Sequence, residues 1–425
     1  MRASVRFDHE LLAVEHDHDV SCMLELLAPP APAQAERRPL ALSLVIDRSG
    51  SMAGPKLDIT RRCAAFLVEH LAPTDQLSIV SFDDEVRLVA PLVPVGDNRV
   101  PLLASIEGIF SGGSTNLSGG WLKGIETLAA LDGDTFTRRV LLLTDGQANV
   151  GIKDAAQLAT MARASADDGI GTTTIGFGEG FSEDLLAGMA DGGGGGAYFA
   201  ETPDAAPGIF TEEFADLMSL VAQNVSVEIR PAWDDVKLLT VFNDFPQMQV
   251  EGGVQVMLGD AYGYERRRVV FQLHVPGIDT LGPAKIADVI VRYVEIGEQV
   301  AMHELSLPLV VNAVSADDAA AAVPDAEVTE EVVVLLATRA QDEAREAADD
   351  GRYDVAQKVL KEAAQNLRAT AKGSARADEL LAQADAFEQR TNMLAPESSM
   401  LERKRMTYEN RTMKQRRQKP DGGPR

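Results

Sequence analysis

The stretch LSLVIDRSGSMAG, residues 42–54, decides the fold of this 425-residue chain. It begins with an uncharged and almost entirely apolar run, which is typical of a strand buried on both faces of a sheet. The run ends at Asp47, and Ser49 and Ser51 follow at alternate positions, so the three side chains share one side of an extended chain. The stretch therefore predicts a buried strand that leads into a cluster of oxygen-bearing side chains.

Short apolar runs alternate with helical periods along the following part of the chain. The runs are LALSLVI (40–46), QLSIVSF (76–82), RVLLLT (139–144) and GTTTIGFG (171–178). The stretches with helical spacing of apolar residues are 56–71, 118–131, 154–166 and 206–221. Buried strands that alternate with helices indicate a parallel sheet covered on both faces. We therefore predict an open, doubly wound α/β domain with a mostly parallel sheet over residues 39–223.

The rest of the chain has other patterns. Residues 224–314 contain strand-like runs without helical periods, which indicates a flanking β-sandwich. Residues 1–38 are too few to bury a core alone, so we expect them to add strands to this sandwich. Residues 323–394 are rich in Ala, Glu and Leu and predict a C-terminal helical hairpin or bundle. Residues 402–425 carry nine Lys and Arg against three acidic residues, which favours a basic, disordered tail.

Composition excludes several classes of protein. The 40 basic and 65 acidic residues give a net charge of −25, which repels phosphate and argues against duplex nucleic acid as a partner. Two cysteines, Cys22 and Cys63, cannot build a disulfide framework or a cysteine-rich zinc site. The sequence shows neither a secretory signal nor a run of about 18 apolar residues. We expect a soluble, cytoplasmic protein without a membrane association.

The donor types at the end of the first strand point to a hard metal ion. A carboxylate and hydroxyls, without sulfur or imidazole, suit Mg²⁺ or Mn²⁺ better than zinc. Two further segments should reach the same edge of the sheet, where open α/β domains bind ligands. One is the loop SGGSTNLSGG (111–120), in which Thr115 is favoured over Ser114 as the third hydroxyl, and the other supplies Asp145 after an apolar strand.

These residues resemble the von Willebrand factor type A family and its metal-ion-dependent adhesion site. The motif of that site is Asp-x-Ser-x-Ser, then Thr, then Asp, and it corresponds here to Asp47, Ser49, Ser51, Thr115 and Asp145. The organisation without a signal peptide is similar to uncharacterised cytoplasmic proteins of bacteria with this domain. The order of segments is also similar to inter-alpha-trypsin inhibitor heavy chains.

The resemblance implies a division of roles. The two serines, and in one state Thr115, would bind the ion directly, while Asp47 and Asp145 would hold its waters. One coordination position would be left for a Glu or Asp of a partner protein. In this family the exchange of Thr for Asp coordination can move the last helix, here near 206–221.

Three functions remain in competition at this point. The leading one is a metal-dependent protein–protein interaction module that acts as a scaffold, with no catalytic residues and no organic cofactor. The first alternative is an accessory subunit of a separate AAA+ ATPase complex, since the chain has no nucleotide-binding motif of its own. The second is a Mg²⁺-dependent hydrolase, although the motif loops offer only Arg48 as a cation and no His as a base.

Three other motifs have simpler interpretations. The glycine run 192–196 lacks the Lys-Ser/Thr of a phosphate-binding loop and is predicted to be a flexible surface loop. His16 and His18 have no third partner nearby in sequence, which argues against a metal site. The acidic cluster 83–85 is predicted to be a solvated turn, with a place near the metal edge as the alternative.

Overall fold

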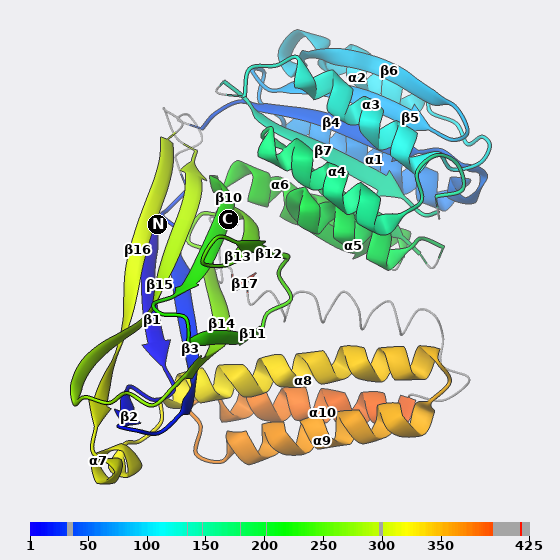
Figure 1. Ribbon diagram of the computed structural model, residues 1–425. Helices are drawn as coiled ribbons and strands as arrows, with labels where there is room; N and C mark the ends of the chain where they lie inside the picture. The colour runs from blue at the N-terminus through cyan, green and yellow to red at the C-terminus, as the bar shows by residue number, and fades with distance from the viewer. Residues whose placement is uncertain are drawn as a thin grey trace.

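The computed structural model describes residues 1–31, 37–133, 135–146, 148–178, 180–200, 202–296, 301–393 and 417–418. The chain forms an α/β domain, a β-sandwich and a group of long helices, and the sandwich contacts both of the other parts (Figure 1). The α/β domain follows strand β3 (His18–Leu27) and precedes strand β10 (Leu220–Pro231), and both of these strands belong to the sandwich. The α/β domain is therefore an insertion between two sandwich strands.

The sheet of the α/β domain has the strand order β6-β5-β4-β7-β8-β9. Its strands are β4 (Leu40–Asp47), β5 (Gln76–Phe82), β6 (Val86–Pro94), β7 (Thr137–Thr144), β8 (Ile170–Phe177) and β9 (Gly194–Ala200). β6 runs antiparallel to β5, and the other neighbours pair in parallel. This confirms the predicted doubly wound, mostly parallel sheet.

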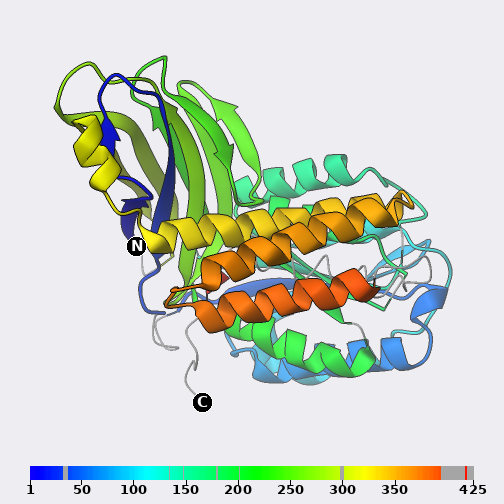
Figure 2. The ribbon, with the colours of Figure 1, turned by 90° about the horizontal axis from the view of Figure 1, so that it is seen from below.

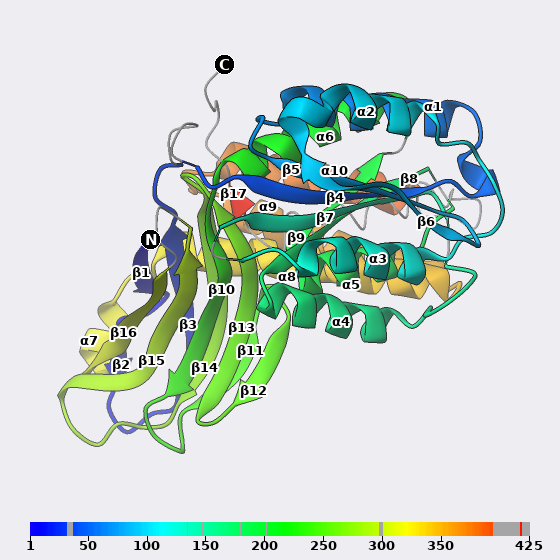
Figure 3. The ribbon, with the colours of Figure 1, turned by 90° about the horizontal axis from the view of Figure 1, so that it is seen from above.

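Helices cover both faces of this sheet because β4 is apolar in both directions. Leu42 and Leu44 pack into one core with helices α1, α2 and α6, whereas Ala41 and Val45 pack into a second core with α3, α4 and α5. Figure 3 shows the two helical layers above and below the strands. The bounds of the helices are α1 (Pro55–His70), α2 (Val95–Glu107), α3 (Leu117–Ala129), α4 (Ala155–Asp167), α5 (Glu183–Gly192) and α6 (Ala206–Met218).

The sandwich combines strands from both ends of the chain. One sheet has the order β1-β3-β14-β11, and the other has the order β12-β13-β10-β15-β16-β2. The remaining strands are β1 (Arg2–Phe7), β2 (Leu11–Ala13), β11 (Lys237–Val241), β12 (Gln247–Val250), β13 (Gly253–Tyr262), β14 (Arg266–Val275), β15 (Gly282–Glu295) and β16 (Ala301–Val314). The N-terminal strands thus pair within both sheets, and β10 begins at Leu220, before the predicted boundary at residues 223–224.

Most of the predicted basic tail, residues 402–425, lies outside the described residues. Its described part is the short strand β17 (Arg417–Gln418), which pairs antiparallel with the start of β14.

Three long helices follow the sandwich and lie side by side (Figures 1 and 2). They are α8 (Ala326–Asp349), α9 (Tyr353–Ala371) and α10 (Ala377–Met393), preceded by the short α7 (Ala316–Ala321). Val328 and Leu335 of α8 pack on the outer side of the sandwich. Glu331 of α8 is buried there and pairs with Arg268 of β14 at 3.3 Å and with Arg376 at 3.0 Å. No helix among the described residues is long and apolar enough to span a bilayer.

The prediction of a surface loop at residues 192–196 is wrong. The glycines end α5 and begin β9, which pairs in parallel with β8. A Cβ at Gly195 would lie 2.2 Å from the carbonyl oxygen of Thr172, and one at Gly193 would lie 2.6 Å from the Thr172 Cβ. The glycines therefore serve close packing against β8.

A buried ion pair joins the α/β domain to the sandwich. Arg139 of β7 is fully buried and pairs with Asp260 of β13, which is also buried. Arg139 additionally donates a hydrogen bond to the Thr173 hydroxyl, and that hydroxyl donates to the buried carboxylate of Glu213 in α6 at 2.6 Å. The contact therefore ties β7, β8 and α6 to the second domain.

We expect Arg139→Met to lower the free energy of unfolding by about 3–5 kcal/mol, because the change leaves a buried carboxylate without its partner. The double variant Arg139→Met, Asp260→Leu should lose less, since it removes both charges. Arg352→Met, which removes an exposed pair with Asp350, is the control and should change stability by less than about 1 kcal/mol. Urea unfolding of the full chain measures all three. A single variant as mild as the control would contradict the prediction.

Candidate metal centre

The two predicted aspartates lie side by side at the carboxyl edge of the central sheet. Asp47 is the last residue of β4, and Asp145 follows the end of β7, the parallel neighbour of β4. β4 also pairs with β5 on its other side. The chain therefore continues from β4 to strands on one side of it, and later adds β7 and the following strands on the opposite side. Such a switch in strand order opens a crevice at the carboxyl ends of the strands, which is where α/β domains bind ligands.

Asp47 is fully buried and held by hydrogen bonds on both carboxylate oxygens. Its Oδ1 accepts from the backbone N–H of Ser49 at 2.8 Å, and its Oδ2 accepts from the hydroxyl of Thr144 at 2.5 Å. Burial, with a smaller contribution from the charge of Asp145, raises the pKa of Asp47 to about 6 against the effect of these hydrogen bonds. No ion pair to Asp47 occurs within the described ranges, so its negative charge favours a bound cation.

The hydroxyls of the motif connect the two aspartates. Ser49 Oγ lies 3.1 Å from Ser51 Oγ, and the Ser51 hydroxyl donates to Oδ1 of Asp145 at 2.7 Å. Ser51 lies in a short 3-10 turn, Gly50–Met52, directly after the extended residue Ser49. The alternate spacing read from the sequence therefore holds for Ser49, while the turn brings Ser51 toward the second strand.

Thr115 reaches the same place from the loop between α2 and α3. The loop is fastened by hydrogen bonds from Gly50 N–H to the carbonyl of Gly113 at 2.9 Å and from Gly112 N–H to the carbonyl of Arg48 at 2.7 Å. Thr115 is buried whereas Ser114 is exposed.

The position of Gly146 shows how close Thr115 and Asp47 are. A Cβ at Gly146 would lie 3.1 Å from Thr115 Oγ1 and 3.6 Å from Asp47 Oδ2. The two oxygens thus both lie close to Gly146, which carries no side chain. Thr115, not Ser114, therefore supplies the threonine-loop hydroxyl near Asp47.

The arrangement suits a small octahedral cation. Neighbouring oxygens around Mg²⁺, bound at 2.0–2.1 Å, are separated by about 2.9 Å. The two hydroxyl contacts of the motif, at 3.1 and 2.7 Å, bracket this value. All five predicted residues lie at one edge and supply only carboxylate and hydroxyl oxygens, so the donor set fits such an ion. Their role as metal ligands stays a prediction.

Asp83 supports the site, so the alternative interpretation of the acidic cluster 83–85, a place near the predicted metal edge, holds for this residue and the favoured solvated turn does not. Asp84 and Glu85 are exposed, but Asp83 is buried, pairs with Arg48 at 2.7 Å and accepts from Gly113 N–H at 3.0 Å. Burial raises the pKa of Asp83, but the N–H groups of Gly113 and Glu85 and the charge of Arg48 outweigh it and hold the pKa below its usual value. The sequence contains a signal for this position: Asp83 directly follows the buried strand β5, and Asp47 is likewise the last residue of the buried strand β4.

Lys56 is a second residue that the motif did not reveal. It lies in the first turn of α1, and its ammonium forms an ion pair with Oδ2 of Asp145. The same ammonium lies 3.4 Å from the carbonyl oxygen of Ser51. The site therefore contains a cation of the protein itself beside one of its two aspartates.

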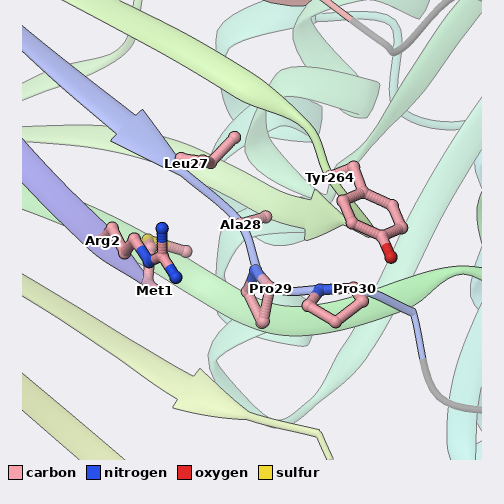
Figure 4. A pocket seen from close by; sticks show the side chains of 7 residues that line it. All are labelled: Met1, Arg2, Leu27, Ala28, Pro29, Pro30 and Tyr264. Carbon is pink, nitrogen blue, oxygen red and sulfur yellow. The ribbon is translucent and has the colours of Figure 1, made fainter.

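Other candidate sites are weaker. His16 and His18 each turn a ring nitrogen to a main-chain carbonyl, and the described part of the chain contains no group of three or more His, Cys, Asp or Glu suited to a metal. A cavity of about 270 Å³ lies in the sandwich, at the end of β3 (Figure 4). Its lining is largely apolar and carries no carboxylate side chain: Met1, Arg2, Leu27, Ala28, Pro29, Pro30 and Tyr264.

Known proteins share the α/β domain of this chain. The sequence model of the von Willebrand factor type A domain matches residues 42–212. The chain is 28% identical over 273 residues to the uncharacterized protein sll0103 of Synechocystis sp., a match that covers 61% of this chain and 64% of that protein. It is 30% identical over 200 residues to the uncharacterized protein YfbK of Escherichia coli, covering 45% and 34%. Inter-alpha-trypsin inhibitor heavy chain H4 of Bos taurus is 30% identical over 172 residues, covering 39% and 19%.

The chain thus spans less than two thirds of the length of each of these relatives. Two solved structures share its fold over nearly the whole length. A von Willebrand factor type A protein from Catenulispora acidiphila superposes with a TM-score of 0.71 at 16% identity, covering 97% of this chain and 96% of that one. The ArnB paralog VWA2 from Sulfolobus acidocaldarius gives a TM-score of 0.62 at 18% identity, covering 97% and 98%. These findings confirm the predicted family resemblance and fold class.

The raised pKa of Asp47 predicts that Asp47→Asn stabilises the protein in EDTA at pH 8. The folded state holds the Asp47 proton up to about pH 6, whereas an unfolded chain releases it near pH 3.8. Wild type therefore loses stability as the pH rises through this window, by up to about 3 kcal/mol, and Asn avoids the loss. Calorimetric melting temperatures at pH 4 and pH 8 measure the difference.

Asp83→Asn is the matched control with the opposite sign. Because its folded-state pKa lies below the usual value, ionised Asp83 stabilises the fold above that value and the variant should melt earlier than wild type at pH 8. An Asp47→Asn protein that is less stable than wild type at pH 8 would contradict the assignment of a buried, cation-seeking carboxylate.

Proposed function

Residues 42–212 belong to the von Willebrand factor type A family, and we propose that the chain uses the metal centre of this domain to bind a partner protein through an acidic side chain. Domains of this family commonly mediate protein–protein interaction at a divalent metal site. The observation that carries the proposal is the meeting of Asp47, Ser49, Ser51, Thr115 and Asp145 at the carboxyl edge of the sheet.

The residues of the chain divide the work by their surroundings. Asp47 and Asp145 are buried and hydrogen-bonded, so they orient the serine segment. Their two negative charges together neutralise the charge of a dication. Ser51 is exposed at the rim, which leaves the site open toward solvent on that side. Mg²⁺ or Mn²⁺, when bound, supplies a fixed positive charge that a Glu or Asp of the partner completes.

The surroundings of the site favour binding over catalysis. The two cations beside the motif, Arg48 and Lys56, are both paired with carboxylates. Hydrolysis at a metal requires a general base and groups that stabilise developing charge. The motif loops contain no His. We therefore propose a cytoplasmic scaffold that recruits an acidic partner and is not itself an enzyme.

The test is capture of partners by the purified full chain with Mg²⁺, compared with Asp47→Ala, Ser49→Ala. Proteins bound by wild type and lost from the double variant should also be lost in EDTA, and each is then expressed and its Kd measured. We expect a loss of at least about tenfold, because the metal holds the central carboxylate contact. A Glu or Asp of the partner whose change to Gln or Asn removes binding would identify the contacting residue.

Asp58→Ala, which removes an exposed carboxylate of α1, is the control and should bind as wild type does. Undiminished binding in excess EDTA would overturn the proposal. An ATPase as the metal-dependent partner would assign the chain to a motor complex.

A further inference from the structure

We infer that Lys56 is a built-in counter-cation of the metal centre, which competes with the dication for Asp145 and thereby lowers the metal affinity of the site. The inference rests on the proposed function, because it requires a metal at the motif residues. Lys56 does not belong to the five-residue motif. The fold places its ammonium beside the motif residue Asp145.

The start of α1 aims Lys56 at the motif. Gly54 has a φ of 78°, a conformation that suits glycine, and Pro55 begins the helix directly after it. Lys56 therefore sits in the first turn, and its ammonium reaches Asp145 Oδ2 and lies near the carbonyl of Ser51. A Cβ at Gly178 would lie 3.6 Å from Lys56 Cε, an ordinary contact distance, so the lysine stem lies beside the residue that follows β8.

The ion pair occupies one oxygen of a residue that the metal site also needs. Asp145 has a fully buried side chain, and its two oxygens are divided between the Ser51 hydroxyl and the Lys56 ammonium. The Lys56 side chain is 33% exposed, so water screens this pair only in part. A dication bound at the serine hydroxyls would lie within a few ångströms of the ammonium, and two cations at such a distance repel each other.

The same charge favours the partner. Two carboxylates balance a dication, and Lys56 adds one further positive charge. The loaded site is then complementary to a single carboxylate of a partner, although the chain as a whole carries −25. Lys56 thus weakens metal binding and strengthens the attraction of an acidic side chain. It acts as a positioning and charge-setting residue and not as a metal ligand.

Titration of the full chain with Mg²⁺ alone, and separately with Mn²⁺, tests the inference by calorimetry. Lys56→Met keeps the length of the stem and removes the charge, and we expect it to bind either ion about tenfold more tightly than wild type. Lys56→Arg keeps the charge and should remain within about twofold of wild type. Lys153→Met removes an exposed lysine from the loop that follows Asp145 and should leave the affinity unchanged.

The outcomes separate the two proposals. Tighter binding by Lys56→Met, with wild-type affinity in the other two variants, supports the inference. Equal or weaker metal binding by a Lys56→Met protein that melts like wild type overturns it and leaves the metal centre in place. No binding of Mg²⁺ or Mn²⁺ by any of the proteins overturns the proposed function and this inference together. A Lys56→Met protein that does not fold is replaced by Lys56→Gln under the same criteria.

Discussion

The burial of the Asp47 carboxylate is the constraint on which the rest of the site depends. A buried charge without a cation is costly unless hydrogen bonds support it, and Ser49 N–H and the Thr144 hydroxyl supply two. The Ser49 donor is local to the loop after β4, whereas the Thr144 donor requires β4 and β7 to be adjacent and parallel in their observed register. Even so, the pKa of Asp47 remains raised to about 6, so the fold holds a carboxylate that hydrogen bonds alone do not fully stabilise. A bound dication would stabilise the ionised form of this carboxylate.

Contacts around the motif hold together the loops that contain Arg48, Asp83 and Gly113. Arg48, which lies within the motif, pairs with Asp83 after β5, and Asp83 accepts from Gly113 of the threonine loop. Two glycines make this possible, because a Cβ at Gly112 would lie 2.1 Å from Asp83 Oδ2 and one at Gly113 would lie 1.8 Å from Asp84 Oδ1. The loops that carry the motif hydroxyls are thus fixed through a buried ion pair whose members are not among the five predicted ligands. Preorganisation of this kind lowers the entropy that binding must overcome.

The sequence predicts those parts of the molecule in which a local residue pattern is compatible with only one structure. β4 was predictable because every residue in it is buried, and the motif was predictable because strand ends of a parallel sheet meet at one edge. The packing of the glycine run 192–196 was not predictable, because a run of glycines is equally compatible with a mobile loop and with a backbone packed closely on Thr172. Lys56 was not predicted and Asp83 was predicted only as an alternative, because their roles depend on which partner the fold brings near, Asp145 and Gly113 respectively. The arrangement of the sandwich likewise depends on pairing between β3 and β14, which are far apart in the chain.

The insertion of the α/β domain into the sandwich leaves the edge that carries the motif accessible to the proposed partner. The chain enters the domain at the start of β4, and the ion pair to the sandwich uses Arg139, near the start of β7. Asp145 follows the end of the same strand, six residues further on, which at about 3.3 Å per residue places it about 20 Å from that contact. In Figure 1 the sandwich lies toward the beginning of β4, and the strand points away from it. The domain is therefore anchored at one end of its sheet and presents the motif at the other, so a protein bound at the metal centre need not displace the anchoring contacts.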